Sequence, residues 1–324
     1  MKRYLKRLTV FVLIISLAAM ALALSGCGSG GSSGGGASGG SELDSVIKDA
    51  SEFLVENVEV DSLDSMGGGW IPFALRMSGT DAADDEYYEA YYDSVRVAAK
   101  TNGGVLSEDR PTANERVSMN LRALGKDPTN VEGEDLMKVV DDYDLICRQG
   151  LNAEIYALIS ANYVGYTLEH EDDYLNDLIE SQNPDGAFGM DSKHPDSDMT
   201  AMALQALSAY DSRIEGNKKS DPRAEKAIDK ALEWLKEMQQ DDGSFGNSES
   251  TAQVIIAMNC LRMDPEGEEF TKGENSLYDG LMAFHTDKGF SHEAGDEVDI
   301  MATEQSLMAL DAIKMAKNGE RIFG

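Results

Sequence analysis

Basic residues are scarce in this sequence. Its 324 residues include 28 lysines and arginines against 59 aspartates and glutamates, a formal net charge of −31 at pH 7. Binding nucleic acid requires basic side chains that neutralise phosphates, and no basic stripe exists here. The same shortage argues against electrostatic docking on anionic lipid. We therefore expect no nucleic-acid partner, while 42% hydrophobic residues suffice for a sizeable core.

Cysteine, histidine and tryptophan are also rare, with three, four and two residues respectively. Cys147 and Cys260 lie in apolar helical contexts without a C-x-x-C partner, which favours two buried thiols and assigns no disulfide. None of the histidines has H-E-x-x-H spacing. They are His170, His194, His285 and His292. The sequence therefore predicts no metal site and no cofactor.

The first 26 residues have the pattern of a secretory signal. A basic head with Lys2 and Arg3 precedes an uncharged stretch from Leu8 to Leu24. The following Leu24-Ser25-Gly26-Cys27 resembles the lipobox of bacterial lipoproteins, which implies that Cys27 is lipidated and becomes the mature N-terminus. An ordinary signal or a single-span anchor is the alternative. The resemblance places the chain on the extracytoplasmic face of a bacterial cell membrane, with the membrane as its partner through the lipid.

A flexible linker is predicted for residues 27–44. Residues 28–41 contain only glycine, serine and one alanine, so they cannot bury apolar area and behave as a tether. Fourteen such residues have a root-mean-square reach of roughly 20 Å. We expect the folded domain to occupy residues 45–324.

This domain consists of six copies of one unit, with starts at residues 68, 114, 152, 200, 251 and 303. Each unit holds a small-residue apolar helix, and segments such as 224–240 between them have the i, i+3, i+4, i+7 spacing of amphipathic surface helices. Strand-like alternation is nearly absent. The sequence predicts an all-α protein in which neighbouring units stack, and the spacing permits either an open solenoid or a closed ring.

The turns between paired helices repeat a Q-x-x-D-G-x-F pattern. It occurs as Gln182 to Phe188 and as Gln239 to Phe245, each followed by an inner helix with Thr-Ala at its start. This pattern resembles the QW-type repeats of the terpenoid cyclase and protein prenyltransferase superfamily, and is most similar to its bacterial cell-surface toroid proteins. The resemblance implies an (α/α)6 toroid, a closed barrel of six inner and six outer helices.

The same resemblance supplies a catalytic hypothesis. Class II triterpene cyclases protonate their substrate with the middle aspartate of a D-x-D-D-T-A motif, and this chain has Asp196, Ser197, Asp198, Met199, Thr200 and Ala201. Asp198 would be the proton donor and Asp196 its neighbour, but Met199 replaces the third acid. Asp198 or Thr200 is equally suited to capping the helix. The zinc site of prenyltransferases needs a cysteine at an inner-helix start, and none of the six starts has one.

Aligning the six starts places polar residues at one mouth of the barrel. We predict a ligand-binding site there, and the preceding column adds Glu115 and Glu304. The hypothesis is a non-catalytic module for a small molecule or protein, with a hydrophobic or corrinoid-like ligand implied by resemblance to cobalamin carriers. The alternative is a terpene cyclase/mutase-like enzyme that uses Asp198. The predicted ligand-binding residues are Trp70, Arg116, Glu154, Asp198, Gln253 and Gln305.

Overall fold

The computed structural model describes residues 38–58, 69–107, 109–191 and 193–324. The chain divides into two units, Met1–Ser38 and Gly39–Gly324. The predicted signal, Cys27 and most of the predicted linker lie outside the described residues. Helix α1 (Ser38–Asn57) begins seven residues before the predicted domain start at 45. No helix in the described ranges is both long and apolar enough to cross a membrane.

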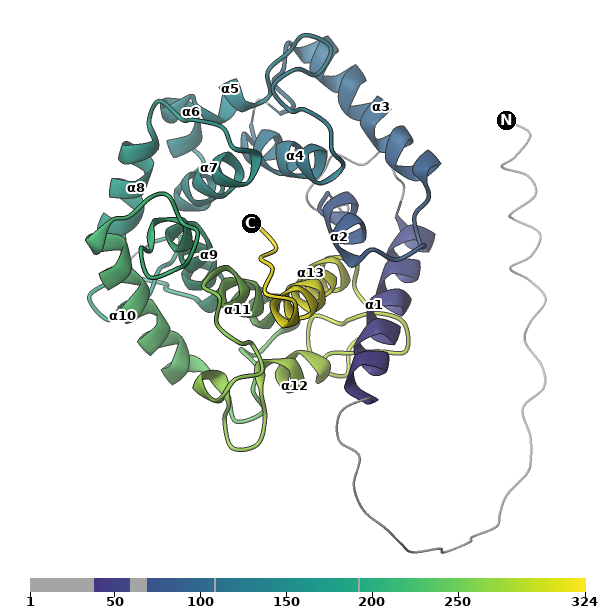
Figure 1. Ribbon diagram of the computed structural model, residues 1–324, viewed down its shortest axis with the longest axis vertical. Coiled ribbons are helices and arrows are strands. Elements are labelled where there is room, and N and C mark those ends of the chain that lie inside the picture. Colours follow the sequence, from purple (N-terminus) through teal and green to yellow (C-terminus); the bar gives the residue numbers. More distant parts are fainter. Residues whose placement is uncertain (1–37, 59–68, 108, 192) are drawn as a thin grey trace, which may run out of the picture. The chain divides into compact units, whose positions relative to one another are not determined.

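The unit Gly39–Gly324 is a ring of two helical layers (Figure 1). The inner layer contains α2 (Ile71–Ser78), α4 (Thr112–Ala123), α7 (Leu151–Val164), α9 (Ser197–Leu207), α11 (Ser248–Cys260) and α13 (Ile300–Lys317). The outer layer contains α1, α3 (Asp85–Asn102), α5 (Met137–Val140) with α6 (Tyr143–Cys147), α8 (Glu171–Glu180), α10 (Pro222–Met238) and α12 (Leu277–Met282). The described residues form isolated bridges but no strand, so the all-α prediction is confirmed.

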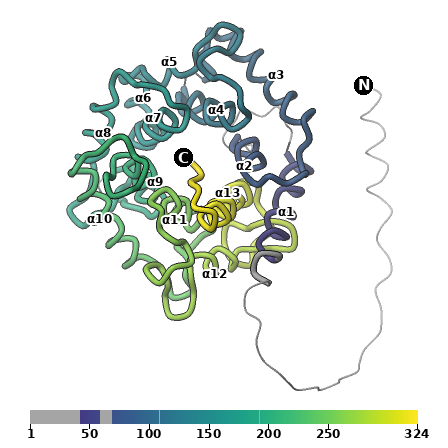
Figure 2. The backbone as a smooth tube through the Cα atoms, in the orientation of Figure 1, coloured from purple at the N-terminus to yellow at the C-terminus, as the bar shows by residue number. Residues whose placement is uncertain are grey.

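The ring is closed. Each inner helix contacts the next one along the chain, and α13 contacts α2. Figure 2 shows the backbone passing round the ring in chain order, so that the last inner helix lies beside the first. Of the two arrangements that the repeat spacing permits, the structure has the toroid.

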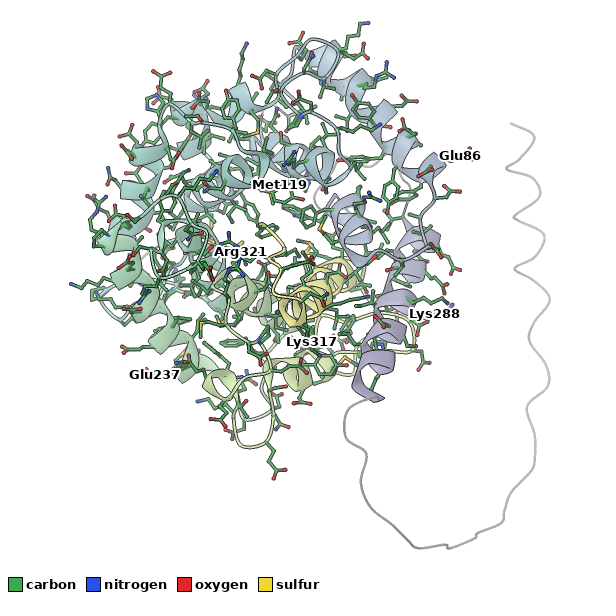
Figure 3. The ribbon with its side chains drawn as sticks, viewed as in Figure 1. Glu86, Met119, Glu237, Lys288, Lys317 and Arg321 are labelled. Carbon is green, nitrogen blue, oxygen red and sulfur yellow. The ribbon has the colours of Figure 1, made fainter. Side chains whose placement is uncertain are left out.

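The two layers differ in which faces they bury. Twelve of the thirteen residues of α11 are buried, because small and apolar side chains allow neighbours to approach on every side. Helix α10 buries only one stripe, from Ala224 to Leu235, as the amphipathic pattern predicts. Glu86 on α3 and Glu237 on α10 are exposed and lie at the rim of the ring (Figure 3). These two carboxylates are thereby kept in solvent.

The glutamine of the repeated turn connects two elements. Gln182 donates from Nε2 to the carbonyl oxygen of Gly186 at 2.9 Å and to that of Ala227 in α10 at 2.8 Å. Gln239 does the same for Gly243 at 3.0 Å and Phe270 at 2.9 Å. The side chain therefore closes its own turn and binds it to a later segment of the chain.

The phenylalanine and the threonine of the repeat are also bonded to each other. The backbone N–H of Phe188 donates to Oγ1 of Thr200 at 3.0 Å. Two further pairs repeat this contact, Phe245 with Thr251 at 3.0 Å and Phe290 with Thr303 at 2.9 Å. The threonine at the start of α9, α11 and α13 thus satisfies a buried backbone donor of the preceding turn.

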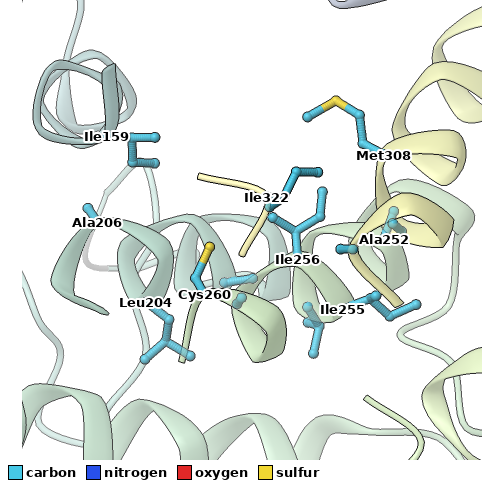
Figure 4. Close-up of a cluster of buried hydrophobic side chains, with 14 of the residues drawn as sticks. Ile159, Leu204, Ala206, Ala252, Ile255, Ile256, Cys260, Met308 and Ile322 are labelled. Carbon is cyan, nitrogen blue, oxygen red and sulfur yellow. The ribbon is translucent and has the colours of Figure 1, made fainter. Parts of the chain in front are cut away.

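The C-terminal segment packs inside the ring. Figure 1 shows the C-terminus near its centre, and Figure 4 shows Ile322 among buried side chains of α9, α11 and α13. Asn259 donates to the carbonyl oxygens of Ala312 and Glu320, both at 3.0 Å, and accepts from the N–H of Ile322 at 2.8 Å. Phe323 lies 5.7 Å from the ring of Phe73.

We predict that Gly243→Ala destabilises the fold more than Gly79→Ala does. Both glycines have positive φ, +87° and +64°, but a Cβ at 243 would lie 2.2 Å from the carbonyl oxygen of Ser276, whereas one at 79 meets nothing within 4 Å. The left-handed backbone costs about 1–2 kcal/mol in either variant, and the clash adds about 1–3 kcal/mol at 243. Urea unfolding measures both losses; equal losses would contradict the close approach.

Candidate binding site at the mouth of the ring

Neighbouring inner helices place equivalent residues side by side. Gln253 of α11 and Gln305 of α13, each the sixth residue of its helix, are joined by a 3.1 Å hydrogen bond. Near the other end of the same helices, Asn259 bonds to the carbonyl of Ala312. We call the end where the inner helices start the mouth; its members are the six predicted residues Trp70, Arg116, Glu154, Asp198, Gln253 and Gln305.

An aromatic pair lies at the mouth. The rings of Trp70, which precedes α2, and Tyr156 of α7 are 5.6 Å apart, although α4 separates the two helices in the ring order. Both side chains are partly exposed. Arg116 of α4 is 5% exposed and acts electrostatically on Tyr156. The sequence analysis did not predict that Tyr156 belongs to the site, although a large aromatic residue in an otherwise small-residue inner helix could have indicated it.

Two glutamates beside this pair are deeply buried. Glu304 is 1% exposed and accepts a hydrogen bond from the backbone of Trp70. Burial raises its pKa to about 8. Burial also raises the pKa of Glu115 well above its ordinary value, and neither of its carboxylate oxygens has a hydrogen-bond partner in the described ranges. Burial thus disfavours the charged form of both carboxyl groups, and protonation removes the cost of burying a charge.

The two predicted glutamines belong to a row of three amides. Gln205 of α9 donates from Nε2 to Oε1 of Gln253 at 2.8 Å and to its backbone oxygen at 3.1 Å. Gln253 in turn donates to Oε1 of Gln305. The sequence alignment missed Gln205 because it lies more than two turns into its helix.

The structure corrects the predicted cap of α9, the helix that contains Asp198. Asp196, and not Asp198 or Thr200, is the N-cap of α9, because its Oδ1 accepts from the N–H of Met199 at 2.7 Å. Asp198 faces Ser250 of α11. Burial raises the pKa of Asp198, while a side-chain hydrogen bond with Ser250 opposes the rise. Its Oδ1 lacks a partner among the residues described.

Glu154 lies in a cluster with Cys147 and Asp177. Its carboxylate, the thiol of Cys147 and the carboxylate of Asp177 each offer an atom, and these three atoms lie within 4.8 Å of one another. Burial and the nearby Asp177 raise the pKa of Glu154. Neither Cys147 nor Asp177 was predicted to belong to a site, since they lie on different helices and share no motif.

A cavity of about 260 Å³ lies at the opposite end of the inner helices from the mouth. Lys219 pairs there with Glu171 at 2.5 Å and donates to Asn162 at 2.8 Å. Arg321, labelled in Figure 3, bonds to Asn217 at 3.2 Å. The cavity was not predicted because a loop and the C-terminal segment build it.

Comparison with known proteins supports the prediction of a toroid fold. Residues 151–297 match the family model of the prenyltransferase alpha-alpha toroid domain. Among solved structures, the unsaturated glucuronyl hydrolase of Bacillus sp. GL1, responsible for the degradation of glycosaminoglycan, superposes with a TM-score of 0.55. The two share 12% identity over 83% of this chain and 95% of that chain, a likeness of fold alone. No curated protein matches.

We predict that Glu304→Gln flattens the pH dependence of stability. A carboxyl whose pKa rises from 4.5 to about 8 on folding binds more protons in the folded state, so its contribution is present at low pH and is lost as pH rises through this window. The wild type should lose on the order of 3 kcal/mol more than the variant between pH 5 and pH 8. Urea unfolding at both pH values measures the difference. The exposed Glu297→Gln serves as control, and parallel profiles for wild type and Glu304→Gln would refute the buried acid.

Proposed function

We propose that this chain is a lipid-anchored lipoprotein on the extracytoplasmic face of a bacterial membrane, and that its toroid binds a ligand at the mouth without catalysing a reaction. The basic head, the uncharged stretch and the order Leu24-Ser25-Gly26-Cys27 support the anchor. The glycine- and serine-rich composition of residues 28–41 is typical of a tether between Cys27 and the folded domain, which supports the proposal.

The observation that carries the binding proposal is the contact between Trp70 and Tyr156. Two partly exposed aromatic rings from different repeats meet beside a buried arginine. Aromatic rings provide large rigid contact area, and arginine provides directed donors, so the set suits recognition of a ligand with both apolar and polar parts. The site proposed here comprises Trp70, Arg116, Asp198, Gln253 and Gln305; Glu154 is left out because it faces Cys147 and Asp177.

The ligand class that fits this site is hydrophobic or corrinoid-like. We expect an apolar ring system to pack against Trp70 and Tyr156, and polar groups at its edge to bind Arg116 and Gln305. Binding pockets for such molecules combine apolar walls with a few converging polar groups.

A second candidate function is supported by Asp198 itself. A class II terpene cyclase needs a carboxylic acid that stays protonated at neutral pH. Burial raises the pKa of Asp198, and its Oδ1 lacks a partner within the described chain. Two features oppose this function: Asp196 is engaged as a helix cap, and the third acid of the motif is Met199, which is 3% exposed.

We predict that Cys27→Ser releases the chain from the membrane. The thiol is the only group at this position to which a lipid thioether can be attached, so the serine variant should not incorporate labelled fatty acid. Cell fractionation and metabolic labelling measure both effects, with Cys260→Ser as control. Continued lipid incorporation in Cys27→Ser would contradict the anchor.

We predict that a ligand quenches Trp70 specifically. The sequence has two tryptophans, so Trp234→Phe leaves Trp70 as the only indole. Calorimetric titration with cyanocobalamin, and separately with squalene, should give binding that weakens about tenfold or more in Trp70→Ala and Arg116→Gln and persists in Trp234→Phe. Fluorescence of the Trp234→Phe variant should fall on binding.

The same incubations separate the two candidate functions. A cyclised squalene product that disappears in Asp198→Asn would establish the enzyme in place of the binding module. Ligand binding that is unchanged in both Trp70→Ala and Arg116→Gln would remove the proposed site from the mouth.

A further inference from the structure

We propose that Cys147, Glu154 and Asp177 form a binding site for a divalent transition-metal ion, and that zinc fits it best. This site does not depend on the ligand proposed for the mouth, because it involves neither the aromatic pair nor Arg116. Three different helices supply the three donors: α6 ends at Cys147, Glu154 lies in the first turn of α7, and Asp177 belongs to α8.

Local structure brings these donors together. Asp142 caps the start of α6 by accepting from the N–H of Leu145 at 3.1 Å. Gly150, at φ +98°, then turns the chain from α6 into α7. This tight turn places the thiol next to the first turn of the following inner helix, and α8 packs against α7 from outside.

The geometry is close to that of a three-ligand zinc site. The three donor atoms lie within 4.8 Å of one another. Tetrahedral zinc, with bonds of about 2.0–2.3 Å, requires donors about 3.5 Å apart. The donors therefore have to move together by about 1 Å when the ion binds. Cys147 and Asp177 are partly exposed, so an ion can enter and a water molecule can complete the coordination.

Glu154 is the most deeply buried of the three donors. Its side chain is directed into the cluster and the residue is only 8% exposed. In the described ranges its one hydrogen-bond partner is the thiol of Cys147. A buried carboxylate normally has donors or a cation to compensate it, and a metal ion among the three side chains would provide that compensation.

Binding of the ion displaces a proton. On binding, a metal–sulfur bond forms as the thiol proton leaves to the buffer, and no group is oxidised or reduced.

Tyr143 acts as a positioning residue for Asp177. Its hydroxyl donates to Oδ2 of Asp177, and its ring packs 5.1 Å from that of Tyr174. Metal-binding carboxylates are commonly oriented by such outer hydrogen bonds. The second carboxylate oxygen of Asp177 remains available to the ion.

Thiolate and carboxylate together define the ion. Magnesium and calcium take oxygen ligands only, whereas a cysteine sulfur favours zinc and related ions. Cobalt(II) occupies the same kind of site and reports a bound thiolate by a charge-transfer absorption in the near ultraviolet. Cobalt chloride is therefore the probe, and zinc chloride is the competitor.

The experiment titrates cobalt into the full chain carrying Cys27→Ser, which leaves Cys147 and Cys260 as its only thiols. We expect a charge-transfer band that saturates at about one cobalt per chain and is abolished by zinc. The band should be lost in Cys147→Ser and kept in Cys260→Ser, the matched control. Glu154→Gln should weaken binding, and Tyr143→Phe should weaken it about tenfold while the band remains.

A second measurement needs no site variant. Zinc should protect Cys147 from alkylation by iodoacetamide, as detected by peptide mass, and this protection should decline as pH falls because protons compete for the thiolate. Absence of the band at millimolar cobalt, a band that persists in Cys147→Ser, or alkylation of Cys147 that is unaffected by zinc would each overturn the site. These results do not depend on any ligand at the mouth, so either proposal can fail alone.

Discussion

A helix such as α11, which is buried over nearly its whole circumference, has to be covered by neighbours on every side. A single outer helix covers one of its faces, so two further inner helices must cover its flanks. The same holds for each inner helix in turn, and the requirement ends only when α13 meets α2. Ring closure therefore leaves no inner helix with an uncovered flank, and the turns, caps and core keep the six pairs at the same level.

Much of this fold could be predicted from the sequence because its signals are local and repeated. The glutamine, glycine, phenylalanine and threonine of the turn recur with their spacing, and each makes the same contact in successive units, as with Gln182 and Gln239. Closure was not predictable from the repeat alone, because an open solenoid buries the same faces except at its ends. The resemblance to known toroids made that choice.

The site was predictable only in part, for physical reasons. The column of inner-helix starts brought Gln253 and Gln305 together, since equivalent positions on neighbouring helices lie side by side. It could not show which way each side chain turns. Glu154 faces Cys147 and Asp177 in place of Trp70, and the cap of α9 is Asp196 because the helix begins earlier than its Thr-Ala pair suggests. Contacts between an inner helix and the outer helices beside it have no fixed spacing along the sequence, so no sequence pattern predicts them.

The row of three amides also has a fixed polarity. Gln205 lies against the backbone oxygen of Gln253, and a carbonyl can only accept, so Gln205 must present its NH2 group there. Gln253 must then offer oxygen to Gln205 and NH2 to Gln305, whose own oxygen is occupied in turn. The last amide of the row, on the partly exposed Gln305, therefore presents its NH2 group as a donor. A ligand that binds the NH2 group of Gln305 therefore has to offer a hydrogen-bond acceptor. A ligand that offers only donors at that point cannot extend the row of hydrogen bonds.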